Sequence, residues 1–474
     1  MHSPDHSKEE SQTMKRLSVV FLIALMIVAS VAPVVSGAGT ARLYTIVLKE
    51  SVAASAAADV VAKAGGLVVD TVPEVGGVQA QGGDAFLGKV LADTRVQAAG
   101  PSIVMSLKVP KAEAFQDTEV NIAAADLYNT YQWDIKRVTN NGASYDLGTG
   151  SHGVVVAVVD TGINGAHPAL VKNFLGGRNF VPAGAFGDTT ETGDPNDYMD
   201  RYGHGSHVAG TIGGNGRILG VAPDVGLRAY RVLAANGSGY SEWIAKGMVA
   251  AANDGAAVIN MSLGGYDVMG QVFWTDPATG KAYNLGHDVA DFLLYRRAVQ
   301  YAAAHGTLVV ASAGNDGLNM ADKTNATELL NEEYGEFGYT FVGATFKAPA
   351  GVAGVITVSA TGPDDSVSSY SDYGVGYVNV AAPGGDFKRY PVGDWYTDMC
   401  LSAYKTSGYA WMAGTSMAAP KVSAVAALVK AAHPEYNVSQ VAAAVSRSAE
   451  DLGRVGTDQL FGDGLVNAYN ALAK

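Results

Sequence analysis

The feature of this sequence that most constrains its fold is a set of uninterrupted apolar runs that alternate with helical patterns. Val154–Val159 contains only valine and alanine, which is typical of a strand buried on both faces. We expect further strands at Leu227–Leu233, Ala257–Met261, Thr307–Ala311 and Gly354–Ser359, with helices between them such as Ser241–Asn253 and Val289–His305. This alternation predicts a doubly wound α/β fold with a mostly parallel sheet. In such folds, functional sites lie at the carboxyl ends of the strands.

A smaller unit precedes this body, in residues 42–107. Its patterns follow the order β-α-β-β-α-β, with Ser102–Leu107 expected as the last strand, which predicts a small ferredoxin-like α+β domain. Residues 108–125 show no periodicity and are interpreted as a linker. The main domain is expected to span residues 127–474.

The N-terminus is typical of a secretory signal peptide. Met14-Lys15-Arg16 precedes an apolar run over residues 17–32, and small residues follow. We therefore expect residues 1–37 to be a signal peptide, with Met14 as the true start. A retained membrane anchor is the alternative, but the run is shorter than the roughly 20 residues that a spanning helix needs. The expected location is extracellular, without membrane contact once the signal is removed.

Charge and cysteine content exclude several classes of function. Lys and Arg number 32 against 45 Asp and Glu, a net charge of −13, which argues against binding nucleic acid through its phosphates. The single cysteine, Cys400, excludes an intrachain disulfide framework and a cysteine-ligated zinc site. An exported protein with one cysteine is more typical of a bacterium than of an animal.

Four polar residues occur where catalysis would need them, although each has an ordinary structural explanation. Asp160 ends a buried strand but can be a turn residue, and Asn315 follows a strand but can form an Asx turn. His204 lies among small residues that allow close helix packing. Ser416 precedes a long helical pattern over Ala418–Ala432 and can simply cap that helix.

Other chemistries fit these residues less well. An aspartic protease of the two-lobed type needs a second Asp-Ser/Thr-Gly motif, which the chain lacks. His204 and His207 form a possible metal pair, but no His-Glu-x-x-His motif accompanies them.

Taken together, the motifs resemble the subtilisin-like serine protease (subtilase) family. The shared stretches are VAVVDTGI at 156–163, GHGSHVAGT at 203–211, GVAP at 220–223, INMSLGG at 259–265, AGN at 313–315, AAPG at 381–384, GTSMAAP at 414–420 and FGDGLVNA at 461–468. The resemblance implies a subtilisin-like fold and a serine endopeptidase with the triad Asp160, His204 and Ser416. It implies that Asn315 stabilises the oxyanion.

The same resemblance implies how substrate binds and how the enzyme matures. An extended peptide would lie against Ser262, Leu263 and Gly264, with Ala313 and Gly314 as the facing wall of the specificity pocket. Residues 42–107 are similar to the family's inhibitor and chaperone propeptide, so we expect autocleavage within residues 108–125. We expect a monomer that needs no cofactor.

Departures from the family pattern leave some points open. The calcium loop that many subtilisins carry after the catalytic histidine is too short here, and the acidic loop Asp188–Asp200 either binds structural Ca²⁺ or is a solvated loop. Insertions lie at residues 266–288 and 318–346. The second carries Glu332, Glu333 and Glu336, which either favour basic peptides or belong to a solvated lid.

Several stretches resemble the lantibiotic leader peptidases of the family, among them WDIKRVTNNG at 133–142, NGRILGVAP at 215–223 and SEWIA at 241–245. A protease dedicated to one leader peptide is therefore the alternative to a general secreted endopeptidase. An inactive, subtilase-shaped binding module is a further alternative, which the intact triad and oxyanion residues disfavour.

Overall fold

The structure is a computed structural model that describes residues 42–83, 85–102, 104–108, 126–275, 280–287 and 289–473. The predicted signal peptide and most of the predicted linker lie outside the described residues. Within the described residues, no helix is both long and apolar enough to cross a membrane.

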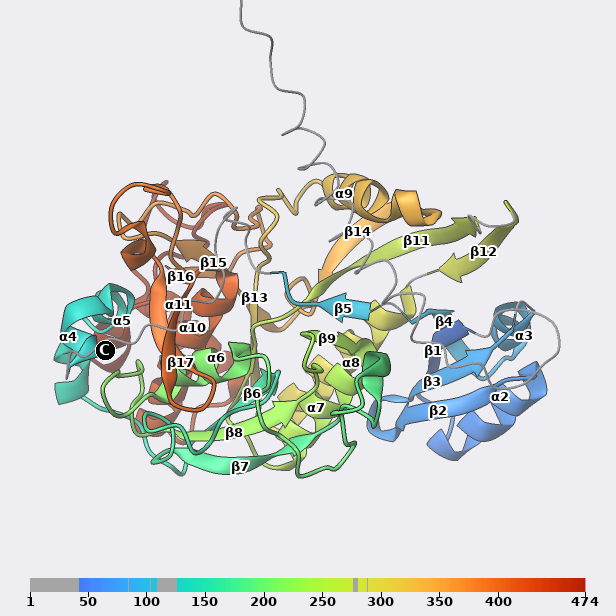
Figure 1. Cartoon of the computed structure of the whole chain (residues 1–474), viewed down its shortest axis with the longest axis horizontal. Coiled ribbons are helices and arrows are strands. Elements are labelled where there is room, and N and C mark those ends of the chain that lie inside the picture. The colour runs from blue at the N-terminus through green and yellow to red at the C-terminus, as the bar shows by residue number, and fades with distance from the viewer. Residues whose placement is uncertain are drawn as a thin grey trace, which may run out of the picture.

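A seven-stranded parallel sheet forms the centre of the larger domain (Figure 1). Its order is β16-β15-β13-β10-β6-β8-β7. The strands are β6 (Val155–Asp160), β7 (Phe174–Asn179), β8 (Gly226–Arg231), β10 (Val258–Met261), β13 (Leu308–Ser312), β15 (Val355–Thr361) and β16 (Val380–Pro383). The predicted doubly wound fold with a mostly parallel sheet is confirmed.

Helices cover both faces of this sheet, and the side chains of β6 show why its sequence is apolar throughout. Val156 and Val158 pack in the core cluster that contains α10 residues, while Ala157 and Val159 pack in the cluster that contains α7 and α8 residues. The helices of the domain are α4 (Leu127–Tyr131), α5 (Trp133–Val138), α6 (His204–Gly213), α7 (Ser241–Asn253), α8 (Val289–Ala304), α10 (Thr415–Ala432), α11 (Val438–Ser448) and α12 (Ala468–Ala473).

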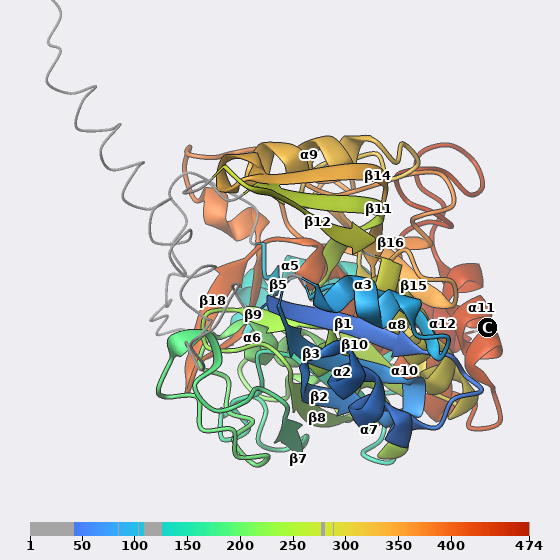
Figure 2. The same cartoon turned by 90° about the vertical axis from the view of Figure 1, so that its right-hand side faces the viewer.

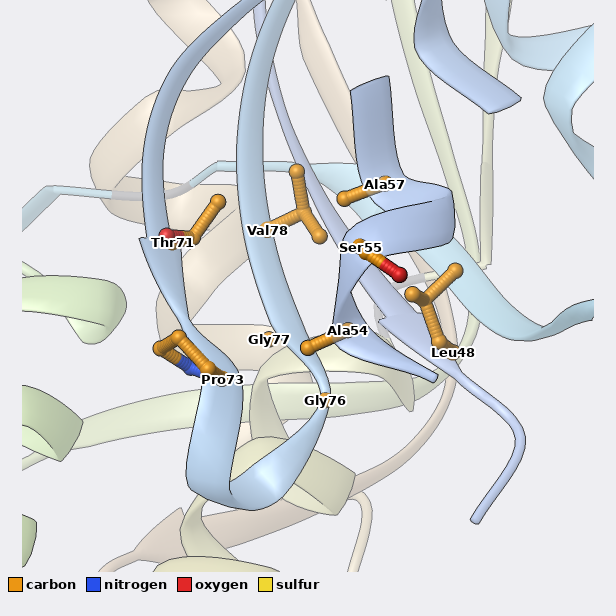
Figure 3. Close-up of a pocket in the computed structure, with 9 residues that line it drawn as sticks. All are labelled: Leu48, Ala54, Ser55, Ala57, Thr71, Pro73, Gly76, Gly77 and Val78. Atoms are coloured by element: carbon orange, nitrogen blue, oxygen red, sulfur yellow. The ribbon is translucent and has the colours of Figure 1, made fainter. Parts of the chain in front are cut away.

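The N-terminal domain, residues 42–101, is a four-stranded antiparallel sheet with two helices, seen face-on in Figure 2. The sheet order is β2-β3-β1-β4. The elements are β1 (Arg42–Leu48), α2 (Ala57–Ala64), β2 (Leu67–Val72), β3 (Gly77–Gly82), α3 (Phe86–Ala92) and β4 (Val96–Pro101). A small, mainly apolar hollow opens between β1, the β2–β3 turn and the start of α2 (Figure 3). Because only residues of this domain line it, it is not part of the site described below.

The prediction that Ser102–Leu107 is the last strand of the small domain is wrong. The fourth position of the sheet is taken by β4, and the chain then leaves this domain. Val104–Ser106 forms β5, which pairs antiparallel with β9 (Ser238–Tyr240) of the larger domain, Met105 opposite Gly239. Leu107 continues this pairing by donating its N–H to the Gly237 carbonyl at 3.0 Å.

The two insertions fold together into one substructure above the N-terminal domain (Figure 1). They form a three-stranded antiparallel sheet in the order β12-β11-β14, against which α9 packs. The elements are β11 (Gly265–Thr275), β12 (Ala282–His287), α9 (Asn325–Tyr334) and β14 (Tyr339–Ala348). A further hairpin, β17 (Cys400–Tyr404) with β18 (Gly408–Met412), packs on α6.

Candidate active site

Asp160 and His204 form a buried pair at the carboxyl edge of the sheet. Asp160 is the last residue of β6, and His204 is the first residue of α6. His204 Nδ1 lies 2.8 Å from Asp160 Oδ1 and 3.0 Å from Oδ2. A carboxylate that binds Nδ1 fixes the imidazole orientation and leaves Nε2 as the nitrogen for proton transfer.

Close backbone contact brings this pair together. A Cβ at Gly205 would lie 2.1 Å from the Gly162 carbonyl oxygen, so only glycine allows α6 to approach the end of β6 this closely. Thr161 Oγ1 accepts the Gly205 N–H at 2.9 Å and donates to Asp200 at 2.8 Å. The other Asp200 oxygen accepts the Ser206 N–H at 2.8 Å. Asp200 therefore fixes the start of α6, a role that the sequence did not reveal.

Ser416 lies at the start of α10, which packs against α6. Its hydroxyl donates to the Ser262 carbonyl at 3.0 Å, and the Ser262 hydroxyl donates to the Ser416 carbonyl at 2.7 Å. These two hydrogen bonds join the serine to the Ser262–Gly264 segment. The predicted nucleophile and the predicted substrate-binding segment are therefore adjacent.

Asn315 has a fixed orientation just beyond β13. Its Oδ1 accepts hydrogen bonds from the N–H and the hydroxyl of Thr415, both at 2.9 Å. The amide nitrogen is thereby directed outward, and it donates to the Lys108 carbonyl at 2.8 Å. Lys108 belongs to the segment that follows the N-terminal domain. Its carbonyl oxygen thus accepts from the Asn315 amide, the group that the family resemblance implies as the oxyanion donor.

The Lys108 side chain enters an acidic site. Its Nζ lies 2.9 Å from Glu333 Oε1 on α9 and 3.4 Å from Asp316 Oδ1, and it faces the Tyr266 ring at 5.6 Å. Burial lowers the pKa of Lys108, but the two carboxylates outweigh this effect and raise it above its ordinary value. The charges are thus complementary to a cationic side chain.

Tyr266 and Asp372 support this acidic site from beneath. Tyr266 Oη lies 2.7 Å from an oxygen of both Asp316 and Asp372. Gly314, at φ +126°, lets Asp372 approach, since a Cβ there would meet the Asp372 carboxylate at 2.1 Å. Ala313 is buried, with its N–H bonded to the Val358 carbonyl and its carbonyl to the Tyr377 hydroxyl. Of the two predicted wall residues, Gly314 therefore borders the acidic site while Ala313 packs in the sheet.

His207 does not face His204 as a metal-binding partner would. Its Nε2 lies 3.1 Å from the carbonyls of Cys400 and Ala410, in the β17–β18 hairpin. Burial, followed by the neighbouring His204, lowers the pKa of His207 to about 3, so its ring is neutral. This arrangement is that of a structural histidine.

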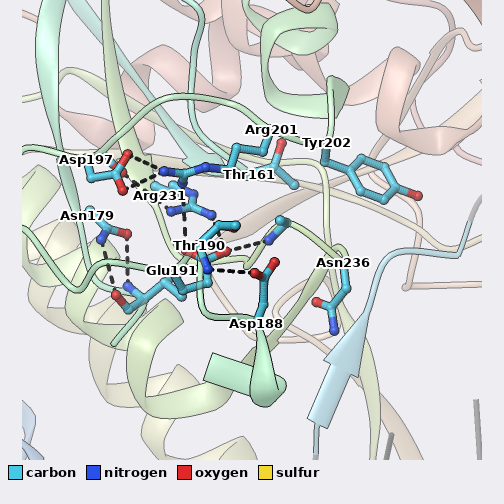
Figure 4. A network of polar contacts seen from close by, with 12 residues as sticks. Thr161, Asn179, Asp188, Thr190, Glu191, Asp197, Arg201, Tyr202, Arg231 and Asn236 are labelled. Carbon is cyan, nitrogen blue, oxygen red and sulfur yellow. Dashed lines mark hydrogen bonds and ion pairs between the residues drawn. The ribbon is translucent and has the colours of Figure 1, made fainter. Parts of the chain in front are cut away.

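Two of the acidic residues in the loop over residues 188–200 pair with arginines (Figure 4). Glu191 forms a fully buried ion pair with Arg231 at 2.6 Å, and Asp197 pairs with Arg201 at 2.7 Å. Across the described ranges, no group of three or more His, Cys, Asp or Glu residues is arranged to hold a metal ion.

Comparison with known proteins identifies the family. Residues 151–464 match the subtilase family, peptidase S8, over more than half of the chain. The chain belongs to the subtilase family. This assignment agrees with the resemblance that the motifs carry.

Among relatives, the subtilase is similar to proteases named for leader-peptide processing. It is 38% identical to the nisin leader peptide-processing serine protease NisP of Lactococcus lactis subsp. lactis over 63% of this chain and 43% of NisP. It is 34% identical to the epidermin leader peptide-processing serine protease EpiP of Staphylococcus epidermidis over 64% of this chain and 65% of EpiP. The chain thus spans less than two thirds of the length of either relative.

Among solved structures, the subtilase resembles the epidermin leader peptide processing serine protease EpiP from Staphylococcus aureus, crystallised as a serine-to-alanine mutant. The match has a TM-score of 0.77 and 28% identity, and it covers 91% of this chain and 99% of that one. The likeness therefore extends well beyond residues 151–464, which match the family.

Sequence reasoning missed several residues around the site. From the sequence, Asp200 is expected only as a possible calcium ligand, although its position four residues before His204 suits a role in starting the helix. Lys108 was included only as the first residue of the linker. Tyr266 and Glu333 lie in insertions, and of the three glutamates noted there, Glu333 contacts Lys108 while Glu332 and Glu336 are exposed. Only the folded chain shows which glutamate faces the site.

Proposed function

We propose that this chain is an exported serine endopeptidase that matures by cutting its own chain after Lys108. The observation that carries the proposal is the Lys108 carbonyl, 2.8 Å from the Asn315 amide nitrogen. That carbonyl belongs to a segment that continues from a strand paired with β9, which is how an extended substrate is held. This arrangement supports residues 104–108 as the substrate segment and Lys108–Val109 as the bond to be cut.

The residues divide the reaction between them. Ser416 Oγ attacks the Lys108 carbonyl carbon, and its proton passes to His204, whose imidazolium is stabilised by Asp160. Negative charge develops on the carbonyl oxygen, and the Asn315 amide and the Ser416 N–H stabilise it. His204 then gives its proton to the amine of Val109, which leaves. Water, activated by His204, then attacks the acyl-enzyme in the same way, which frees the Lys108 carboxylate and restores the Ser416 hydroxyl.

The Lys108 side chain supports a preference for a basic residue before the cut bond. Glu333 and Asp316 supply charge, and Tyr266 supplies an aromatic face for the cation. A narrow preference of this kind suits a processing enzyme. The similarity to NisP and EpiP favours the second candidate, a protease dedicated to a leader peptide that ends in Lys or Arg.

Maturation tests the proposal. Wild-type protein should yield a mature form that begins at Val109, and Ser416→Ala should retain residues 42–108, as intact mass and N-terminal sequencing will show. A fluorophosphonate probe should label the wild type and not Ser416→Ala. If Ser416→Ala matures normally in a protease-deficient host, the self-cleavage proposal is wrong. If the probe labels neither protein, the chain is a binding module.

A further inference from the structure

The N-terminal domain docks on α7 and α8 through a mixture of charged and neutral contacts. Arg297 of α8 donates to the Leu48 carbonyl at 2.6 Å and to the Val75 carbonyl at 3.1 Å. Lys246 of α7 forms an ion pair with Asp70 of β2. Between these anchors lies a carboxyl group that the catalytic mechanism does not use.

This group is Glu242, in the first turn of α7, and the N-terminal domain covers it. Its side chain is fully buried, and both of its carboxyl oxygens accept from neutral groups of the N-terminal segment. Gln79 Nε2 donates to Oε2 at 3.2 Å, and Ser102 Oγ donates to Oε1 at 3.3 Å. Along the described chain, Glu242 forms no ion pair with a lysine, arginine or histidine.

The charged groups behind Glu242 do not offset its charge. The negative charge of buried Asp291 on α8 acts on Glu242, and it also acts on buried Asp267 of β11. Tyr295 of α8 is neutral, since burial raises its pKa well above its ordinary value. Lys347 of β14 lowers the pKa of Asp267, but burial and Asp291 outweigh this effect. Three acids therefore share one buried region in which the described residues offer no metal site.

Docking of the N-terminal domain over these acids is easiest if Glu242 takes up a proton, because a neutral carboxyl group can be buried without a cation. Burial, followed by repulsion from Asp291, raises the pKa of Glu242 to about 8. Burial and Asp291 likewise raise the pKa of Asp267. A cavity of about 420 Å³ between the two domains is lined by residues that include Asp70, Gln79 and Trp243, and Gln79 also donates to Glu242.

We propose that Glu242 couples release of the N-terminal domain to pH, carrying a proton while the domain is docked and losing it when the domain leaves. This inference rests on the proposed function, in which the chain is cut after Lys108, and on the expectation that residues 42–108 then inhibit the active site. Acidic conditions keep the cut domain bound over the site, and a rise in pH releases it.

The direction of the effect follows from the two states of the carboxyl group. When the N-terminal domain leaves, Glu242 faces water and its pKa returns toward the ordinary value of 4.5. Docking therefore takes up a proton. The docking equilibrium is strongest below about pH 4.5 and weakens by up to tenfold per pH unit until about pH 8, above which it is level.

Hydrogen exchange on the uncut Ser416→Ala full chain tests this coupling. Protection of residues 42–101, corrected for the intrinsic rate at each pH, should fall by up to tenfold per unit between about pH 5 and 8. Glu242→Gln cannot ionise, while its carbonyl oxygen can still accept from Gln79 and its amide can donate to the Ser102 hydroxyl, so it should flatten this slope. Lys246→Met is the matched control, because it should weaken docking equally at every pH and leave the slope unchanged.

A second variant guards against poor folding of Glu242→Gln. Asp291→Asn removes the nearest like charge, so the fall in protection should end at a lower pH. If Glu242→Gln keeps the wild-type slope and Asp291→Asn does not move the pH at which the fall in protection ends, the coupling through Glu242 is wrong. Since Ser416→Ala cannot cut itself, this result is independent of whether the proposed self-cleavage is correct.

Discussion

The side-chain amide of Asn315 is held by one neighbour and directed at another. Thr415 donates twice to Oδ1, which leaves Nδ2 to face the Lys108 carbonyl. The sequence predicted Asn315 at this edge, because polar residues that follow buried parallel strands gather there. It could not predict Thr415 as the residue that orients the amide, since that contact joins positions 100 residues apart.

The first prediction concerns this donor. Asn315→Ala should lower kcat by about 10²–10³-fold with a small change in KM, because the amide acts on charge that develops in the transition state. Steady-state kinetics on a peptide with Lys before the cut bond will measure both. Thr415→Ser keeps both orienting donors and should stay near wild type. A large rise in KM with unchanged kcat would instead mean that Asn315 binds the ground state.

A second residue-scale prediction concerns the acidic site. Glu333→Gln should lower kcat/KM about fivefold for peptides with Lys before the cut bond, and little for peptides with Gln there. The effect is modest because Glu333 is over a third exposed, where ion pairs contribute about 1 kcal/mol or less. Glu332→Gln, an exposed neighbour, is the control. Equal losses for both peptides would argue against a role in selecting charge.

At the scale of elements, the sequence predicted the central strands well and the edges poorly. β6 and β13 are buried on both faces, so apolar runs mark them, whereas β7 at the sheet edge contains two glycines and an arginine and was missed. The wrong prediction for Ser102–Leu107 has a related cause. The residue pattern of a short extended segment does not show which sheet the segment joins. Here Val104–Ser106 pairs with β9 in the larger domain.

The helix that carries Ser416 is tied to α5 by a buried ion pair. Lys421 Nζ lies 2.7 Å from Asp134 Oδ2, and both side chains are fully or almost fully buried. Burial lowers the pKa of Lys421, but Asp134 outweighs burial and raises it. Because neither side chain reaches water, removal of either one would leave the other buried without its partner.

The third prediction follows from this pair. Lys421→Met in the Ser416→Ala background should lower the free energy of unfolding by about 3–5 kcal/mol, since it leaves Asp134 buried without its cation. Adding Asp134→Leu should recover most of this loss. Denaturant unfolding of the single and double variants will measure it. A double variant no more stable than the single would show that the pair is not the source of the loss.

At the scale of the whole molecule, the two insertions and the segment after the N-terminal domain meet at one residue, Lys108. The segment after the N-terminal domain brings Lys108 to the Asn315 side chain just beyond β13, and α9 of the second insertion brings Glu333 within hydrogen-bond distance of the Lys108 side chain. β11 of the first insertion contributes Tyr266. If the ion pair between Lys108 and Glu333 positions the bond for cutting, a variant in which the two residues exchange charges should still be cut.

Lys108→Glu alone should slow maturation by over about a hundredfold, because it places a third carboxylate beside Asp316 and Glu333 and costs several kcal/mol in like-charge repulsion. Glu333→Lys alone should slow it less, since Asp316 still faces Lys108. The double variant should mature faster than Lys108→Glu, because the exchanged charges attract, although Asp316 keeps it below the wild-type rate. Glu332→Lys combined with Lys108→Glu is the control and should give no recovery, as Glu332 is exposed.

Maturation rates are measured from the appearance of the mature mass over time in purified protein. Independent effects of the two substitutions would show that Lys108 and Glu333 do not act on each other during the cut, and selection of the bond would then depend on the β5–β9 pairing alone.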